Sequence, residues 1–141
     1  MAERDPVTMR WDWDAIRAGA MVALVFAVPL SIAGRWAADS RDDPALAVLL
    51  NIGAVVGFVL GAGCAAWVQR VGTPLSHGLV TAVGTYLAAQ AVFVTIRLVR
   101  GLDVRWFALM FNLTAVLGAG LLGGLLGQRL RSRGIYPKGQ L

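Results

Sequence analysis

The chain has 141 residues, of which 57% are hydrophobic, and it carries 13 Lys and Arg against 8 Asp and Glu, a formal net charge of +5. Its single cysteine excludes an internal disulfide. A basic chain can bind nucleic acid, but here the arginines cluster at the ends of long uncharged runs, which is typical of membrane orientation. We therefore expect an integral membrane protein with no nucleic-acid partner.

Four uncharged stretches follow one another along the chain, at Ala18–Gly34, Pro44–Gln69, Val71–Ile96 and Trp106–Gln128. A helix rises about 1.5 Å per residue, so about 20 apolar residues cross the hydrocarbon core of a bilayer. The sequence predicts a single all-α transmembrane domain over residues 1–141. Its four spans are expected at about 14–37, 44–69, 74–99 and 104–130.

Capping signals agree with these spans. A side-chain oxygen before a helix accepts hydrogen bonds from its free N–H groups, and proline suits the first turn. The expected caps, in chain order, are Asp12 or Asp14, Asp43 before Pro44, Thr73 before Pro74, and Asp103. Glycines that suit helix C-termini follow arginine-containing turns at Gly72, Gly101 and Gly134. The loops are short, so neighbouring helices should be antiparallel.

The distribution of Lys and Arg predicts the orientation of the spans. The side that holds both tails and the middle loop carries eight of them: Arg4, Arg10, Arg17, Arg70, Arg129, Arg131, Arg133 and Lys138. The other side carries five: Arg35, Arg41, Arg97, Arg100 and Arg105. We expect a multi-pass protein of the bacterial cytoplasmic membrane with both termini cytoplasmic. The basic C-terminal tail should attract anionic lipid headgroups.

The second and fourth spans resemble each other in sequence. Asn51-Ile-Gly-Ala54-Val55-Val-Gly57 matches Asn112-Leu-Thr-Ala115-Val116-Leu-Gly118. This similarity predicts a tandem repeat of two helical hairpins, related by a pseudo-two-fold axis along the membrane normal.

Small residues recur every fourth position on the same two spans, where they allow helix backbones to approach closely. They are Gly53, Gly57 and Gly61 on the second, and Ala115, Ala119, Gly123 and Gly127 on the fourth. Two interpretations are open: packing within one four-helix bundle, or a face that associates with another copy or another membrane subunit.

Four uncharged polar residues lie within the spans: Asn51, Tyr86, Gln90 and Asn112. They can form interhelical hydrogen bonds, with Asn51 and Asn112 bonding across the pseudo-two-fold, or they can line a polar path. No Asp, Glu, Lys or Arg lies deep within a span, which argues against a carrier built on a membrane carboxylate. The only histidine, His77, is expected to have a capping or interfacial role.

The run from Gly61 to Tyr86 holds a glycine-rich span end, a basic loop, the pair His77-Gly78, and then Gly84-Thr-Tyr86. With the run from Trp106 to Asn112 and the Leu122-Gly-Gly124 element, it resembles the YrzE-like small four-span bacterial membrane proteins. The resemblance implies the same four-span fold and adds no particular activity.

The sequence offers no paired carboxylates, no nucleophile beside a base and no metal-ligand cluster, so we expect no catalytic, cofactor-binding or metal-binding residues and no enzyme. The favoured interpretation is a non-enzymatic membrane protein that acts by helix–helix association, as a homo-oligomer or as an accessory subunit of a membrane complex. The alternative is a small channel or transporter with a polar path along Tyr86, Gln90, Asn51 and Asn112.

Overall fold

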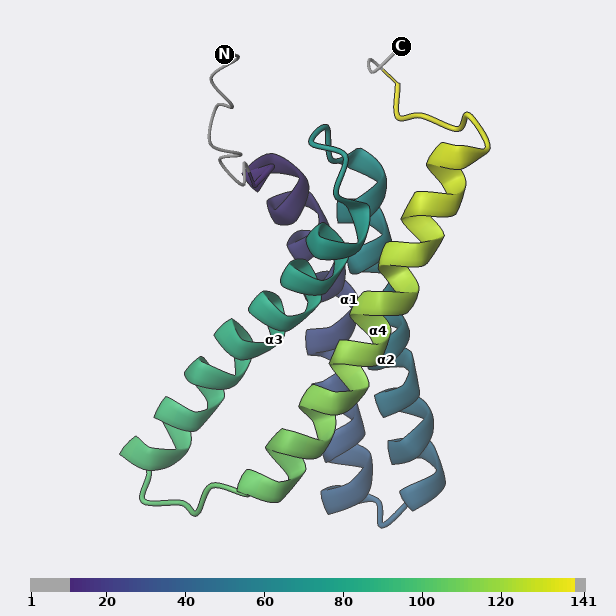
Figure 1. Ribbon diagram of the computed structural model, residues 1–141. Coiled ribbons are helices and arrows are strands. Elements are labelled where there is room, and N and C mark those ends of the chain that lie inside the picture. Colours follow the sequence, from purple (N-terminus) through teal and green to yellow (C-terminus); the bar gives the residue numbers. More distant parts are fainter. Residues whose placement is uncertain (1–10, 139–141) are drawn as a thin grey trace.

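The computed structural model describes residues 11–138, which form four helices and no strand (Figure 1). The helices are α1 (Trp13–Ser40), α2 (Pro44–Val68), α3 (Pro74–Val99) and α4 (Trp106–Ser132). All four are long and apolar enough to cross a membrane, which confirms the predicted all-α, four-span class. Arg4 and Arg10, which contribute to the predicted orientation, lie outside the described residues, and the tandem repeat stays a prediction.

The starts of α1 and α2 follow the predicted capping chemistry. The Asp12 carboxylate accepts from the backbone N–H of Ala15 at 3.1 Å, and the Asp43 carboxylate accepts from that of Leu46 at 3.0 Å. Each bond satisfies a donor that has no partner within its helix. Proline opens α2 and α3 as expected, although the Thr73 hydroxyl does not cap a backbone N–H of α3 and instead lies 3.0 Å from Nδ1 of His77.

The start of α4 differs from the prediction. The helix begins at Trp106 rather than at residue 104, and Arg105 rather than Asp103 occupies the capping position. The reason lies in the preceding loop, because Arg97 Nε of α3 donates to the backbone oxygen of Asp103 at 2.9 Å. This bond holds residue 103 to the end of α3, so the helix begins later.

Gly101 and Gly134 follow the ends of α3 and α4 as predicted, whereas Gly72 lies within the α2–α3 loop, because α2 already ends at Val68 with Gln69 as its C-cap. Gly72, Gly101 and Gly134 have φ angles of +85°, +65° and +74°. Glycine adopts this left-handed conformation at low cost because it has no Cβ. At the end of α3, the N–H groups of Gly101 and Leu102 then reach back to carbonyls in the last turn.

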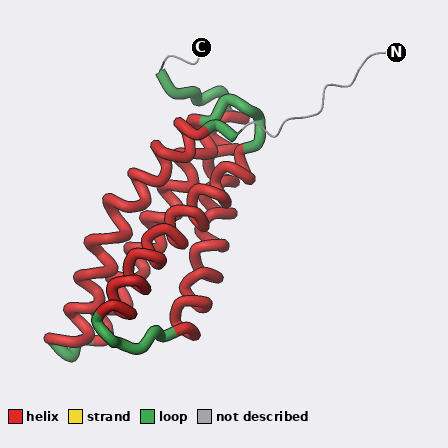
Figure 2. The backbone as a smooth tube through the Cα atoms, turned by 90° about the vertical axis from the view of Figure 1, so that its left-hand side faces the viewer, coloured by secondary structure: helices red, strands yellow, loops and turns green. Residues whose placement is uncertain are grey.

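The helices pack as an antiparallel bundle with two unlike ends (Figures 1 and 2). We call the end with the start of α1, the α2–α3 loop and the end of α4 the tail end, and the opposite end the loop end. In the half toward the tail end, α1 packs against α2, and α4 packs against both α2 and α3. Toward the loop end α3 diverges from the α1–α2 hairpin, whereas α1 and α2 stay side by side.

The small-residue positions on α2 and α4 face other helices of the same chain. A Cβ added to Gly61 would lie 2.5 Å from the backbone oxygen of Gly19 and 2.7 Å from Ala23 Cβ on α1. A Cβ on Gly127 would lie 2.6 Å from Ala66 Cβ on α2. The α1–α2 and α2–α4 contacts are therefore backbone against backbone, closer than any larger residue permits.

Candidate functional site

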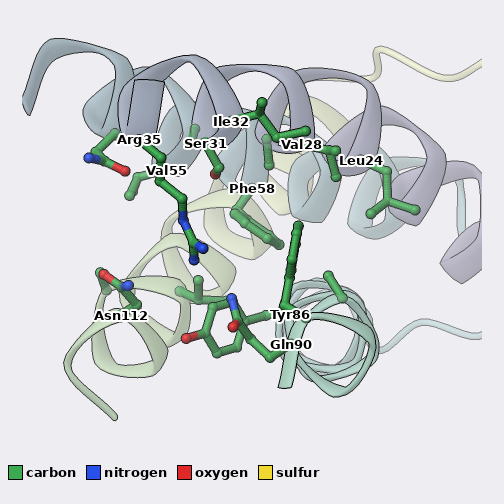
Figure 3. Close-up of a pocket in the computed structure, with 17 residues that line it drawn as sticks. Leu24, Val28, Ser31, Ile32, Arg35, Val55, Phe58, Tyr86, Gln90 and Asn112 are labelled. Atoms are coloured by element: carbon green, nitrogen blue, oxygen red, sulfur yellow. The ribbon is translucent and has the colours of Figure 1, made fainter. Parts of the chain in front are cut away.

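A cavity lies between the helices in the half of the bundle toward the loop end. Its inner part, of about 160 Å³, is lined by residues from all four helices (Figure 3). Its outer part, of about 320 Å³, reaches the ends of α1 and α3 and the start of α4. The two parts adjoin, because both are lined by Arg35, Asn51, Gln90, Phe93 and Asn112.

All four polar residues selected from the sequence line this cavity. Asn51 comes from α2, Tyr86 and Gln90 come from α3, and Asn112 comes from α4. Tyr86 and Gln90 are four residues apart and therefore share one helix face. The packing of the helices brings three separate polar stretches of the sequence into one space.

The two asparagines do not form the expected bond with each other. Asn51 Nδ2 donates to the carbonyl of Ala47 in its own helix at 2.9 Å, and no hydrogen bond joins Asn51 to Asn112 within residues 11–138. The physical reason is the cavity itself, which separates α2 from α4 at this level. The Oδ1 atom of Asn51 and the amide of Asn112 are thus not engaged in helix–helix contacts.

Tyr86 plays the interhelical role that the sequence allowed. Its hydroxyl donates to the carbonyl of Leu109 on α4 at 2.8 Å, and its ring packs edge-on against Phe58 of α2 with ring centroids 6.2 Å apart. The side chain is only 4% exposed. Tyr86 therefore forms a wall of the cavity and fixes α3 to both neighbours.

Arg35 is a cavity-lining side chain that sequence reasoning missed, because it was counted only among the charges at the ends of spans. Its guanidinium turns into the space between the helices, toward Gln90 and Asn112 (Figure 3), and its Cζ lies 5.4 Å from the centre of the Phe93 ring. The helix register could have revealed it. Leu24, Val28, Ser31 and Arg35 recur at offsets of four, seven and eleven residues, which places them on one face of α1.

The cavity mouth is positively charged. Three arginines and one aspartate line the outer part, which gives a formal charge of +2: Arg35, Arg97, Arg105 and Asp39. The only ion pair within the described residues is that of Arg17 with Asp14, at the other end of α1. A concave site of one charge sign between low-dielectric walls concentrates ions of the opposite sign.

His77 closes the bundle at the tail end. It is fully buried, and its Nε2 accepts the backbone N–H of Asp12 at 3.0 Å. The proton must then sit on Nδ1, which lies 2.9 Å from the carbonyl of Thr73 and donates to it. The neutral ring thus joins the start of α1 to the start of α3, beyond the interfacial role expected from the sequence.

Further bonds tie the α2–α3 loop to this point. The Asp12 carboxylate accepts from the backbone N–H of Arg70 at 3.0 Å. The buried Gln69 Oε1 accepts from Val71 and Gly72, both at 2.8 Å, and Arg131 of α4 donates to the Gln69 carbonyl. We call Asp12, Gln69, Thr73, His77 and Arg131 the tail cluster. It joins elements from all four helices, and none of its residues lines the cavity.

Within residues 11–138, no three His, Cys, Asp or Glu side chains come together where they could hold a metal ion. No protein-family model, no curated protein and no solved structure matches the chain. The class that the structure defines is therefore a multi-pass, four-helix integral membrane protein with a polar-lined cavity between its helices. The resemblance to YrzE-like proteins stays a prediction.

Proposed function

We propose that the protein is a small channel or transporter that takes up a solute in the cavity between its four helices. One observation carries the proposal. Asn51, Gln90 and Asn112 come from three helices, and they converge with Arg35 on one space whose remaining walls are mostly apolar side chains. Polar groups inside a span are costly unless they bind a partner or line a path for a solute. The amides of Gln90 and Asn112 have no hydrogen-bond partner within residues 11–138.

The cavity reaches exposed residues at the loop end, whereas no residue of the tail cluster lines it. The exposed residues Asp39 and Arg105 line the outer part of the cavity. At the opposite end, the Gly19–Gly61 contact and the tail cluster leave the four helices packed together. This arrangement supports a carrier whose cavity is accessible from one side. For a solute to cross the membrane, the helix contacts at the tail end must separate.

The distribution of Lys and Arg supports a more specific proposal for the membrane and for the orientation of the protein in it. We infer a bacterial cytoplasmic membrane with the tail end in the cytoplasm, because eight Lys and Arg lie on that side against five on the other. The cavity then opens to the exterior. Arg129, Arg133 and Lys138 are exposed at the tail end, where they can bind anionic lipid headgroups. No catalytic role is proposed.

Helix–helix association with a second chain is the second candidate. The small-residue positions that motivated it, such as Gly57 and Gly123, contact α1 and α2 of the same chain. Two other glycines remain exposed: Gly84 on α3 and Gly118 on α4, where an added Cβ would meet no atom within 4 Å. These two positions are the remaining support for a homo-oligomer or an accessory subunit.

A flux assay tests the proposal. Proteoliposomes are exposed to a panel of small neutral and ionic solutes, and swelling is followed by light scattering. Asn112→Leu and Gln90→Leu should each reduce the solute flux by about tenfold, the equivalent of one lost hydrogen bond of about 1.4 kcal/mol. Gln128→Leu is the matched control, because this exposed residue of α4 does not line the cavity and the flux should be unchanged.

Flux that stays the same in both cavity variants contradicts the proposed path. A flux no greater than that of protein-free liposomes, together with a stable dimer mass in mild detergent, favours the second candidate.

A further inference from the structure

We infer that the cavity binds an organic anion: a carboxylate carried on an apolar group about the size of a benzene ring. This inference rests on the proposed function and names the chemical class of its solute. It follows from three features of the cavity: an unneutralised guanidinium, uncommitted amides beside it, and an apolar inner wall of limited volume.

The guanidinium of Arg35 supplies the anion site. No carboxylate within the described residues pairs with it, and Asp39, one turn further along α1, forms no ion pair. Its neighbour Phe93 offers a ring face and no hydrogen-bond acceptor, so the five N–H donors of Arg35 are not used by that contact. A guanidinium binds a carboxylate through two parallel hydrogen bonds, which gives geometry as well as charge.

The amides beside Arg35 supply additional donors. Gln90 of α3 and Asn112 of α4 line both parts of the cavity, as Arg35 does, and neither has a hydrogen-bond partner within residues 11–138. Figure 3 shows both side chains beneath the Arg35 guanidinium, on the opposite side of the space from α1. A carboxylate held by Arg35 therefore lies between donors from three helices.

The apolar part of the cavity lies toward the middle of the bundle. Leu24 and Val28 of α1 and Phe58 of α2 line the inner cavity, and Figure 3 places them to one side of Arg35. The volume of about 160 Å³ is close to that of a dry apolar protein cavity, about 150 Å³, that holds benzene. The Arg35 side and the apolar side of the cavity together match a molecule with one charged group and a compact apolar body.

A carboxylate on an apolar group can come from two sources: a water-soluble acid, or a fatty acid from the membrane. The limited inner volume favours the soluble acid. The probes are therefore benzoate, benzamide as its neutral counterpart, and oleate. Binding to the full chain in nanodiscs of zwitterionic lipid is measured by calorimetry.

Benzoate should bind at least about tenfold more tightly than benzamide, because only the anion forms charge-assisted bonds with Arg35. Arg35→Gln should weaken benzoate binding by at least about tenfold. Arg35→Lys keeps the charge but loses the paired geometry, and it should give an intermediate affinity. Arg41→Gln is the matched control, because Arg41 lies at the same end of α1, stacks on Trp36 at 4.7 Å and lines neither part of the cavity.

The inference is overturned if benzoate and benzamide bind with equal affinity. It is also overturned if benzoate affinity is unchanged in both Arg35→Gln and Arg35→Lys. Oleate binding that depends on Arg35, without benzoate binding, supports the carboxylate class from the membrane source. Binding of neither acid overturns the class. If neutral solutes still cross in the swelling assay and this flux is lost in Asn112→Leu, the proposed function survives and only the anion assignment fails.

Discussion

The two ends of the bundle are built from different residues and have opposite properties. At the tail end, glycines on facing helices bring backbones into contact, as at Gly19 with Gly61 and Gly78 with Gly124. At the loop end, the facing positions hold larger side chains such as Arg35 and Phe93, and a cavity separates the helices. Side-chain size along each helix thus sets the local distance between backbones. This distance matters because, where water exclusion does not drive association, helices are held together by close packing.

The sharpest way to break the packed end is to enlarge a contact glycine. In Gly61→Leu the new Cβ meets the Gly19 oxygen at 2.5 Å, so α1 and α2 must separate. We expect a loss of about 3 kcal/mol of stability, the upper part of the usual range for overpacking. Thermal unfolding in detergent measures it.

Gly118→Leu is the matched control for this prediction. An added Cβ at Gly118 meets no atom within 4 Å, and leucine favours the helix over glycine. Its unfolding midpoint should be unchanged or raised. Equal midpoints for the two variants would show that the Gly61 contact does not hold α1 to α2.

A second way to weaken the tail end is to remove the histidine of the tail cluster. His77→Leu leaves the N–H of Asp12 without its acceptor and the carbonyl of Thr73 without its side-chain donor. The Thr73 carbonyl keeps its bond from the backbone N–H of residue 77, but a part-buried N–H left unpaired at Asp12 costs about 1–3 kcal/mol, so we expect a loss of about 2 kcal/mol in reversible unfolding experiments. Ser76→Leu, at the exposed neighbouring position, should change stability little. A similar loss in both variants contradicts the prediction.

The smallest effect is expected at the cavity wall. Tyr86→Phe removes only the hydroxyl that donates to Leu109 and keeps the ring against Phe58. Interhelical hydrogen bonds in membranes average about 0.6 kcal/mol, and we expect a loss of that size. Tyr136→Phe, at an exposed position beyond α4, is the matched control and should have no effect. A loss above about 2 kcal/mol at Tyr86 would mean that the cavity end is as tightly coupled as the tail end.

Local signals in the sequence predicted most of the fold. Charge gaps located the four helices, and Asp12, Asp43 and Gly101 located their ends, because capping depends on residues within one turn. The predicted start of α4 was wrong, because the position of this start depends on a bond between Arg97 and the Asp103 carbonyl. That bond joins two segments whose geometry is set by the loop rather than by any residue pattern.

The site could be predicted only in part. Polar residues within apolar spans are conspicuous, so Asn51, Tyr86, Gln90 and Asn112 were found before the structure. Arg35 was missed because a charge near the end of a span has an ordinary explanation, and only the register of α1 against α3 turns it inward. The tail cluster, too, joins residues 65 apart in the chain, as in the contact of Asp12 with His77, which spacing alone does not reveal.

The two connections at the loop end differ in reach. Residues 41–43 join α1 to α2, and residues 100–105 join α3 to α4. Three residues leave the first pair no freedom to part, whereas six extended residues span about 20 Å. The longer connection therefore permits α3 and α4 to stand farther apart at the loop end than α1 and α2 can, and the stretch of α3 beyond the Tyr86 bond borders the entrance of the cavity.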